Sequence, residues 1–360
     1  MNRPILYLAI TNHGFGHTTR TASIAAEIQK LYPQVLLIIV TTAPRWLLES
    51  YIPGDFILRQ RSFDLGVVQT DSLTMDKVAT LQKLKEIKKN QNSLIASEVN
   101  FIRQNRVNLI LADVPFLATG FAQAASVPCW MTSNFSWDFI YRDWGGEFIE
   151  IADWISDWYT KSDRLFRLPF HAPMSAFPNI IDVGLTGGSP KFSAEEIRTT
   201  WGITAPQEKT ILLTFGGLGL QAIPYENIRK FSDWQFITFD ASAPDLPNLI
   251  KIKNRQYRPV DFMPICGKVM SKPGYSTFAE ATLLGLPIIT IPRDDFAEAA
   301  LLLTGIQNYN HHQIIQPQDF FDGNWDFIDD LPQAPKQAQP MAKNGNETIA
   351  KAVIDYLQLM

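Results

Sequence analysis

Two histidines in a glycine-containing segment have the chemistry of a general base. His13 and His17 lie in the segment NHGFGHTTR, residues 12–20. Histidine can accept a proton near neutral pH, so either side chain suits the deprotonation of a hydroxyl group. Gly14 and Gly16 would let the backbone N–H groups of this segment approach a bound acceptor closely. Each histidine, taken singly, could instead bond the backbone and cap the loop, and the sequence leaves that alternative open.

A second segment, SKPGYSTFAE at residues 271–280, predicts a strand-to-helix turn that binds a diphosphate. Pro273 and Gly274 end the strand, and the free N–H groups at the start of the following helix attract anions. Glu280, about one turn into that helix, is expected to contact a ribose diol, although a solvated helix carboxylate is the alternative. We call the diphosphate-containing ligand the donor, and the residues expected to bind it here are Ser271, Lys272, Pro273, Gly274, Tyr275, Ser276, Thr277 and Glu280.

Two other segments add to this expected donor site. Gly216 and Gly217, in the segment FGGLG, favour a phosphate-binding loop over a plain tight turn. In PRDDFAE, residues 292–298, Arg293 would neutralise a leaving diphosphate and Asp294 would bind sugar hydroxyls. Two adjacent carboxylates without a third ligand are weak evidence for a metal. We therefore expect no metal, and no cofactor beyond a nucleotide-sugar co-substrate.

A segment of alternating aromatic and polar residues in the first half suits recognition of a sugar or other acceptor. It reads NFSWDFIY, residues 134–141. Asn134 and Trp137 are expected to contact the acceptor, together with Asp113 at the end of an apolar run. Asp138 is a further candidate general base. The alternative, a buried aromatic helix start capped by a polar side chain, is equally compatible with this segment.

Each of these segments follows an apolar run that is typical of a buried parallel strand. The runs cover residues 5–10, 35–40, 109–113, 127–132, 211–215, 236–240, 268–271 and 288–291. Helical spacing of apolar residues lies between them, as in 21–31, so the sequence predicts an α/β protein with two doubly wound parallel sheets. Open parallel sheets bind ligands beyond the carboxyl ends of their strands. The strand pattern and the polar segments therefore both place the ligand site at the carboxyl edge of the sheets.

Length and composition set the remaining limits. A chain of 360 residues predicts about two domains, and Pro and Gly residues clustered around 165–190 indicate the connection between them. The net charge of −4, without a long Lys/Arg run, excludes an electrostatic nucleic-acid footprint. No apolar run is long enough for a membrane span and no signal segment is apparent, so we expect a cytoplasmic protein. Several of the nine Trp residues lie between 130 and 158, which leaves peripheral membrane contact open.

At these motifs the sequence resembles the GT-B glycosyltransferases, especially the peptidoglycan N-acetylglucosaminyltransferase. His17 matches a loop histidine of that enzyme. Its motif S-[RK]-x-G-x-x-T-x-x-E is matched by Ser271, Lys272, Gly274, Thr277 and Glu280. The resemblance implies UDP-sugar binding with Glu280 on the ribose. It also implies two Rossmann-like domains facing a cleft, 1–180 on the acceptor side and 181–340 on the donor side, with a final helix within 341–360 that crosses back to the first domain.

Over nearly its whole length the chain resembles more closely the N-terminal, non-kinase region of plant L-arabinokinases and its stand-alone bacterial relatives. The matching stretches are 12–20, 64–74, 134–141, 167–174 and 272–280, with Arg293-Asp294. That region is glycosyltransferase-like. A GHMP-kinase phosphate loop is absent from the sequence, so the resemblance does not imply sugar kinase activity.

Residues and resemblance together lead to one main hypothesis. The chain would be a metal-independent glycosyltransferase that moves a sugar from a nucleoside-diphosphate sugar, expected to be UDP-linked, to the hydroxyl group of an unidentified acceptor. His17, or else His13 or Asp138, would take the proton. A non-catalytic nucleotide-sugar sensor and a nucleotide-sugar epimerase on the same scaffold are the alternatives, and an epimerase would need several carboxylates across the cleft.

Overall fold

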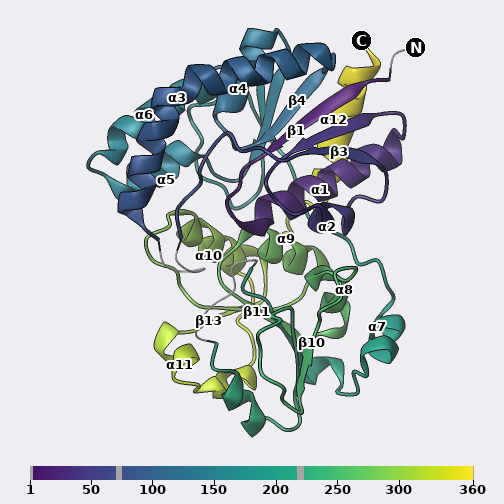
Figure 1. Ribbon diagram of the computed structural model, residues 1–360. Coiled ribbons are helices and arrows are strands. Elements are labelled where there is room, and N and C mark those ends of the chain that lie inside the picture. Colours follow the sequence, from purple (N-terminus) through teal and green to yellow (C-terminus); the bar gives the residue numbers. More distant parts are fainter. Residues whose placement is uncertain (1–2, 70–74, 217–222, 360) are drawn as a thin grey trace.

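The computed structural model describes residues 3–69, 75–216 and 223–359, which form two domains built on parallel β-sheets (Figure 1). The first sheet has seven strands in the order β3-β2-β1-β4-β5-β6-β7. They are β1 (Ile5–Ile10), β2 (Leu36–Val40), β3 (Phe56–Arg59), β4 (Leu109–Asp113), β5 (Cys129–Ser133), β6 (Arg164–Arg167) and β7 (Ile180–Asp182). Every pair of neighbouring strands is parallel.

Helices cover both faces of the first sheet, and this explains the continuous apolar runs of its strands. They are α1 (Gly14–Leu31), α2 (Arg45–Glu49), α3 (Lys77–Gln104), α4 (Leu117–Ala125), α5 (Trp137–Trp144) and α6 (Phe148–Tyr159). Along β1, Leu6 and Leu8 belong to one hydrophobic cluster, whereas Tyr7 and Ala9 belong to another. Successive side chains of a strand point to opposite faces, so a strand covered on both faces must be apolar throughout.

The second sheet has six strands in the order β10-β9-β8-β11-β12-β13. They are β8 (Thr210–Leu213), β9 (Gln235–Thr238), β10 (Leu249–Lys251), β11 (Lys268–Ser271), β12 (Ile288–Thr290) and β13 (His312–Ile314). The α-helices of this half are α7 (Ala194–Trp201), α8 (Pro259–Phe262), α9 (Tyr275–Leu284), α10 (Glu298–Tyr309) and α11 (Pro317–Phe321). Short 3-10 helices lie at Gln207–Lys209, Tyr225–Lys230, Met263–Ile265 and Trp325–Ile328.

The last helix, α12 (Gly345–Gln358), crosses back and packs against α1 of the first domain, as expected (Figure 1). The chain thus passes between the domains twice, once after β7 and once before α12. These two crossings lie side by side, because the Leu185 N–H donates to the Ala342 carbonyl (2.8 Å) and the Gly345 N–H to the Leu185 carbonyl (3.1 Å). A Cβ atom on Gly184 would lie 2.6 Å from the Ala342 carbonyl oxygen, so the crossings are too close for a side chain there.

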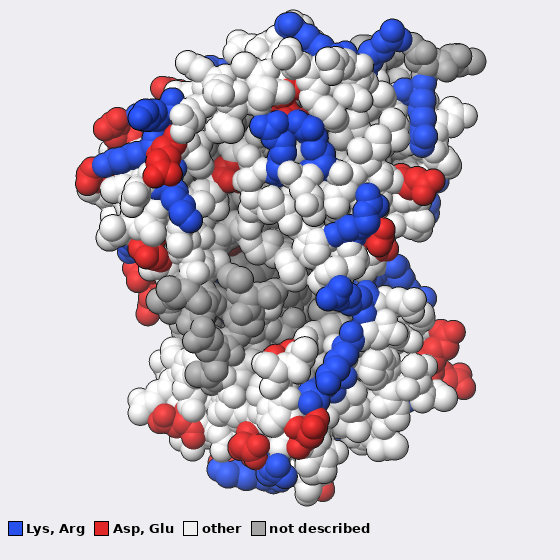
Figure 2. All heavy atoms as spheres, in the orientation of Figure 1, with Lys and Arg blue, Asp and Glu red and all other residues white. Residues whose placement is uncertain are grey.

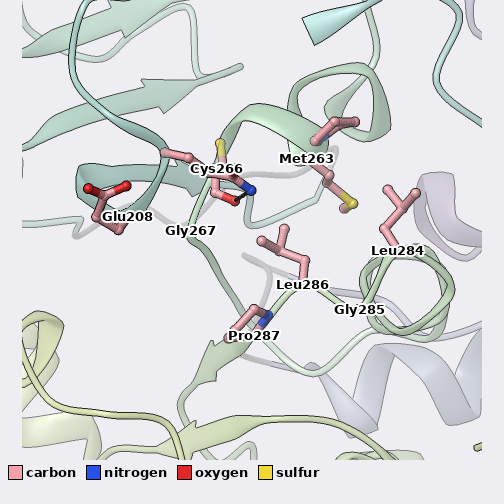
Figure 3. Close-up of a pocket in the computed structure, with 10 residues that line it drawn as sticks. Glu208, Met263, Cys266, Gly267, Leu284, Gly285, Leu286 and Pro287 are labelled. Carbon is pink, nitrogen blue, oxygen red and sulfur yellow. Dashed lines mark hydrogen bonds between the residues drawn. The ribbon is translucent and has the colours of Figure 1, made fainter.

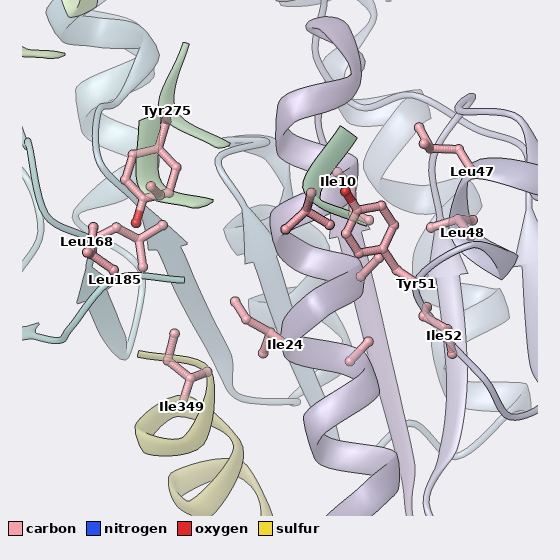
Figure 4. Packing of buried hydrophobic residues seen from close by; sticks show 14 of the residues in the cluster. Ile10, Ile24, Leu47, Leu48, Tyr51, Ile52, Leu168, Leu185, Tyr275 and Ile349 are labelled. Carbon is pink, nitrogen blue, oxygen red and sulfur yellow. The ribbon is translucent and has the colours of Figure 1, made fainter. Parts of the chain in front are cut away.

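One hydrophobic cluster runs through the contact between the two domains. Figure 4 shows Tyr275 of α9 above Leu168 and Leu185, with Ile349 of α12 beneath them. All four side chains are buried. This packing fixes α9 against the first domain and so sets the position of the expected donor segment.

The structure corrects the expected start of α1. Helical spacing was expected from residue 21, but α1 begins at Gly14 and includes most of the segment that was expected to be a loop. Gly14, with φ of +70°, occupies the left-handed region that favours glycine. β7 ends at Asp182, just beyond the boundary expected at 180.

The face drawn in Figure 2 carries Lys and Arg side chains intermixed with Asp and Glu. Within the described residues, none of the helices combines the length and the apolar character that a membrane crossing requires.

Candidate active site

A cavity of about 120 Å³ lies between the carboxyl edges of the two sheets. The first domain contributes residues at the start of α1, and the second contributes the segments that follow β8, β11 and β12. Its lining residues are His13, Gly14, Phe15, Gly16, His17, Arg20, Gln69, Thr214, Gly216, Lys272, Pro273, Gly274, Tyr275, Ser276, Thr277, Arg293, Phe296 and Glu298. The two segments expected to carry the general base and the diphosphate therefore face each other.

His17 is held by a buried carboxylate at the end of β4. Its Nδ1 atom lies 2.8 Å from Asp113 Oδ1, and the Asp113 side chain is fully buried. Asp113 also accepts hydrogen bonds from Arg20 and from the Thr21 hydroxyl (2.8 Å). Because α1 starts at Gly14, His17 and Arg20 lie one turn apart on the helix face that meets β4. The structure thus gives Asp113, expected to contact the acceptor, the role of orienting His17.

The contact with Asp113 indicates which nitrogen of His17 carries the proton. Arg20 Nη2 lies near three atoms: Asp113 Oδ1 at 2.5 Å, Ser133 Oγ at 3.0 Å and His17 Nδ1 at 2.8 Å. A carboxylate only accepts hydrogen bonds, so the 2.8 Å contact with Asp113 Oδ1 assigns the hydrogen to His17 Nδ1 as the donor. In this tautomer Nε2 carries the lone pair that a general base needs.

Burial and the positive charge of Arg20 lower the pKa of His17, and Asp113 and Glu298 only partly oppose them. Burial works against ionisation of Asp113, but Arg20 and His17 outweigh it and keep the pKa of that carboxyl well below its ordinary range. The pair is therefore an ionised aspartate beside a neutral histidine.

This assignment gives a testable pH dependence. Only neutral His17 can accept a proton, so activity should rise with pH through the lowered pKa and be complete above it. We expect the acid limb of a kcat/KM profile between pH 4.5 and 9 to lie below 6.5, the ordinary histidine value. An acid limb at or above that value would show that His17 is not the group that titrates.

His13 forms a wall of the same cavity. Its ring stacks on Phe296 of the second domain at a centroid distance of 5.4 Å and meets the edge of Trp137 at 5.2 Å. Burial, with the neighbouring His17, Arg293 and Lys272, lowers its pKa. Its Nδ1 faces the Val67 N–H at 3.4 Å. His13 is thus a neutral ring fixed by packing.

The opposite wall is suited to an anion. α9 begins after Gly274, which has no side chain to cap the helix, so the first N–H groups of α9 remain available at the cavity. Lys272 follows β11 and Arg293 follows β12, and both side chains line the cavity. Gly216, with φ of +82°, lies against Lys272, since a Cβ there would be 3.3 Å from Lys272 Cε. Gly217 lies outside the described residues.

The hydroxyl groups of Ser276 and Ser271, both expected to contact the donor, are bonded to backbone carbonyls. The Ser276 hydroxyl donates to the Gly16 carbonyl (2.7 Å), so both residues line the cavity while they join α9 to α1. The Ser271 hydroxyl donates to the Lys272 carbonyl (3.0 Å) and does not line the cavity.

Glu280 is not at the cavity, contrary to its expected ribose contact, because it is bound to the chain crossing between the domains. Its Oε1 accepts the Gly188 N–H (2.9 Å) and lies 3.4 Å from the Tyr51 hydroxyl. A Cβ on Gly187 would lie 2.8 Å from Glu280 Cγ, so this crossing packs directly on the carboxylate. Burial raises the pKa of Glu280 to about 7, although Gly188 and Arg258 oppose this.

The raised pKa predicts a stability effect for Glu280→Gln. The folded chain binds a proton at Glu280 more tightly than the unfolded chain, so this group favours folding at low pH and loses that contribution as pH rises from 4.5 toward 7. Glutamine still accepts from Gly188 but carries no charge. We expect the variant to exceed wild type in free energy of unfolding at pH 8, by about 3 kcal/mol at most, and by less at pH 5.

Urea denaturation at both pH values measures this difference. The exposed Glu86→Gln serves as the control and should show no comparable change. A wild type that gains stability over the Glu280→Gln variant between pH 5 and 8 would contradict the prediction.

The remaining expected acceptor residues are buried behind the cavity. Trp137 is fully buried and its indole N–H donates to Asp64 (2.9 Å). Asn134 is fully buried between Arg20 and Glu298. Asp138 lies in the first turn of α5, near the Ser136 hydroxyl, and does not line the cavity. The structure thus has the buried helix start of the alternative interpretation but not its side-chain cap, and Asp138 lies outside the cavity lining.

Asp294 is exposed and does not line the cavity, and its neighbour Asp295 makes the contact between domains instead. Lys77 Nζ lies 2.8 Å from Asp295 Oδ1, and the Trp144 indole N–H donates to the Asp295 carbonyl (2.8 Å). In the described part of the chain, no group of three or more His, Cys, Asp or Glu side chains could hold a metal ion.

A larger cavity, of about 540 Å³, opens at the opposite end of the second sheet (Figure 3). The segments that line it, within residues 207–208, 263–267 and 284–287, come directly before β8, β11 and β12 in the sequence. Glu208 is the one charged side chain among the described residues that line it. Ligands of parallel sheets bind at the carboxyl edge, so the smaller cavity is the candidate site.

Comparisons with known proteins bear on the fold of the chain. No family model matches the chain. Over 327 residues it is 30% identical to the L-arabinokinase of Arabidopsis thaliana, covering 88% of this chain and 31% of that protein. The chain thus spans about a third of the length of the curated relative it matches.

Solved glycosyltransferase structures superpose on the whole chain. A UDP-glucose:anthocyanidin 3-O-glucosyltransferase in complex with UDP matches with a TM-score of 0.61 at 12% identity, covering 99% of this chain and 94% of that one. The calicheamicin glycosyltransferase CalG4 matches with a TM-score of 0.61 at 14% identity, over 100% and 93% of the two chains. Both have the two-domain GT-B architecture.

The chain has the GT-B fold. A third GT-B structure, that of Phytolacca americana UGT2 with UDP-2-fluoroglucose and pterostilbene, matches with a TM-score of 0.57 at 13% identity, covering 100% of this chain and 94% of that one. The fold expected from the strand pattern is confirmed, as is the resemblance to the L-arabinokinase and to GT-B chains.

Several residues of this GT-B site could not be found from the sequence. Arg20, Gln69, Thr214 and Phe296 line the cavity without having been singled out. Glu298 lies within the expected segment 292–298, but nothing in that segment distinguishes it from Asp294. The signal for Arg20 is its place one turn after His17, and that signal appears only once the segment is known to be helical.

Proposed function

We propose that this chain is a glycosyltransferase that moves a sugar from a nucleoside-diphosphate sugar, most simply UDP-linked, to an acceptor hydroxyl. One observation carries the proposal: a neutral histidine and an anion-binding wall face each other across one cavity between the domains. The printed names of the GT-B neighbours, which include complexes with UDP and with UDP-2-fluoroglucose, support the same substrate class.

The geometry supports a single displacement. His17 Nε2 takes the proton of the acceptor hydroxyl, whose oxygen attacks the anomeric carbon of the donor sugar. The bond from that carbon to the diphosphate oxygen breaks, and the nucleoside diphosphate leaves with the bonding electrons. The N–H groups of α9 stabilise the developing charge together with Lys272 and Arg293, which are placed before the reaction begins. Displacement of this kind inverts the anomeric centre.

The epimerase alternative is less compatible with the cavity. It needs several carboxylates across the cleft, whereas among the described lining residues Glu298 is the one carboxylate. The non-catalytic sensor differs from the proposal only in turnover. The cytoplasmic location and the open question of membrane contact remain predictions from the sequence.

A panel of UDP-, GDP- and dTDP-sugars tests the proposal. We expect at least one of them to raise the unfolding temperature of the chain, because a ligand that binds only the folded state stabilises it. The same donor should be consumed in the presence of hydroxyl acceptors. Stabilisation without turnover would favour a sensor, and no stabilisation by any donor would reject the donor site.

A further inference from the structure

A chain of buried polar groups links the second domain to the general base of the first. Glu298 Oε1, at the start of α10, accepts from Asn134 Nδ2 (2.8 Å), and Asn134 Oδ1 accepts from Arg20 Nη1 (2.7 Å). Arg20 then donates from Nε (2.6 Å) and Nη2 (2.5 Å) to Asp113, which orients His17. All five residues in this series of hydrogen bonds have almost completely buried side chains, and Glu298 is the most exposed at 8%.

Asn134 is the point at which this chain passes between the domains. Its carbonyl oxygen faces a guanidinium, which offers only donors, and its NH₂ group faces a carboxylate, which only accepts when ionised. A flipped amide would place donor against donor and acceptor against acceptor. The two neighbours therefore fix the amide orientation, and the amide can satisfy both of them only while α10 lies against the first domain.

The contact between Asn134 and Glu298 connects the donor side of the cavity with the side that holds the general base. Glu298 lines the cavity on the donor side, and Arg20 lines it beside the base. When the domains separate, the hydrogen bond between Asn134 and Glu298 is broken, and water must take the place of each partner. Arg20 and Asn134 both belong to the first domain, so the Asn134 amide is then fixed by Arg20 alone.

We propose that Asn134 is a positioning residue that couples closure of the two domains to the orientation of His17. The inference rests on the proposed glycosyl transfer and adds to it. The donor-side carboxylate Glu298, through Asn134, would add to the first-domain contacts that orient the base. Such coupling would restrict proton abstraction to the closed cavity, from which water is excluded.

A charge-swap cycle tests the coupling. Asn134→Asp places a second carboxylate beside Glu298 and should lower kcat by about 10- to 100-fold, with a smaller effect on KM. Glu298→Gln alone keeps an acceptor for Asn134 and is the matched background. In the double variant Asn134→Asp/Glu298→Gln, the glutamine NH₂ can donate to one oxygen of the introduced carboxylate while Arg20 donates to the other, which restores the contact with reversed polarity.

The expected result is that Asn134→Asp is costly in the wild-type background but changes kcat less than about 3-fold in the Glu298→Gln background. An equal cost in both backgrounds would overturn the inference. If Asn134→Asp does not fold, the cycle of Asn134→Ala and Glu298→Ala gives the same comparison, because the two losses should then be far from additive.

A measurement without substrate separates this inference from the proposed function. The ¹⁵N chemical shifts of the His17 ring report its tautomer. We expect the shifts of the Nδ1–H form in wild type, altered shifts in Asn134→Asp, and a return to the wild-type shifts in the double variant. If His17 does not respond to either substitution, the coupling is rejected whatever the activity. Recovery of the ring in a chain that turns over no donor would leave the coupling standing and reject the transferase.

Discussion

Replacing His17 by glutamine should lower kcat by about 10²- to 10⁴-fold, the usual contribution of a positioned general base. The structure supports this expectation through the neutral ring, the Nδ1–H bond to Asp113 and the place of His17 in the cavity lining. Glutamine has a similar reach but cannot take a proton at neutral pH. Donor affinity should change little, because the anion-binding wall belongs to the other domain.

The measurement is a pair of experiments on the purified chain. Initial rates of donor consumption give kcat, and calorimetric titration with the donor gives its dissociation constant. His311→Gln is the control, since His311 lies outside the cavity. Unchanged turnover in the His17→Gln variant would remove the base assignment, whereas loss of donor binding would indicate that the substitution disturbs the interface between the domains.

Lys272→Met is expected to have the second largest effect, a decrease in kcat of about 10²- to 10³-fold, as for other pre-placed groups that stabilise a developing anion. Lys272 lies beside the start of α9 and against Gly216, where a departing diphosphate would sit. Methionine keeps most of the volume of the side chain and removes the charge. Unlike the His17 variant, this one should also bind the donor more weakly.

The ligand series identifies the cause of the Lys272 effect. The variant should lose affinity for the nucleoside diphosphate of the identified donor but not for the corresponding nucleoside, which has no phosphate to contact. Lys272→Arg should recover part of both losses because it keeps the charge. Lys336→Met, at an exposed position outside the cavity, provides the control. Equal loss for nucleoside and diphosphate would mean that Lys272 acts on the fold and not on the phosphate.

The buried strands and the ligand edge could be predicted from the sequence, since both depend on local patterns. β1 is apolar because helices cover both faces of its sheet, and β11 has two buried apolar residues at its centre, Val269 and Met270; in each case residues that follow the strand form a wall of the cavity. The edge strands β3 and β10 have apolar runs of only three and two residues, and each has one neighbouring strand. Their position is decided by tertiary pairing that no local pattern shows.

The differences between the expected and the observed site also arise from contacts between residues that are distant in sequence. Glycine disfavours helix interiors, so a segment with Gly14 and Gly16 was interpreted as a loop. The buried Asp113 overrides that preference by binding His17 and Arg20 from successive turns of α1. Glu280 matched a donor motif, but the chain crossing at Gly188 binds it. Neither partner lies near in sequence, so the roles of these residues become visible only in three dimensions.

The paired crossings between the domains determine how the molecule can move. The two crossing segments are hydrogen-bonded to each other along one edge, with Gly184 packed against residue 342. They would therefore act as a hinge that restricts the relative motion of the domains. Sliding and twisting of one domain against the other would break the contacts between the segments, whereas rotation about their common axis would not. The opposite edge, where Lys77 meets Asp295, then travels furthest. A rotation of this kind would break the exposed ion pair between Lys77 and Asp295 and open the cavity at that edge.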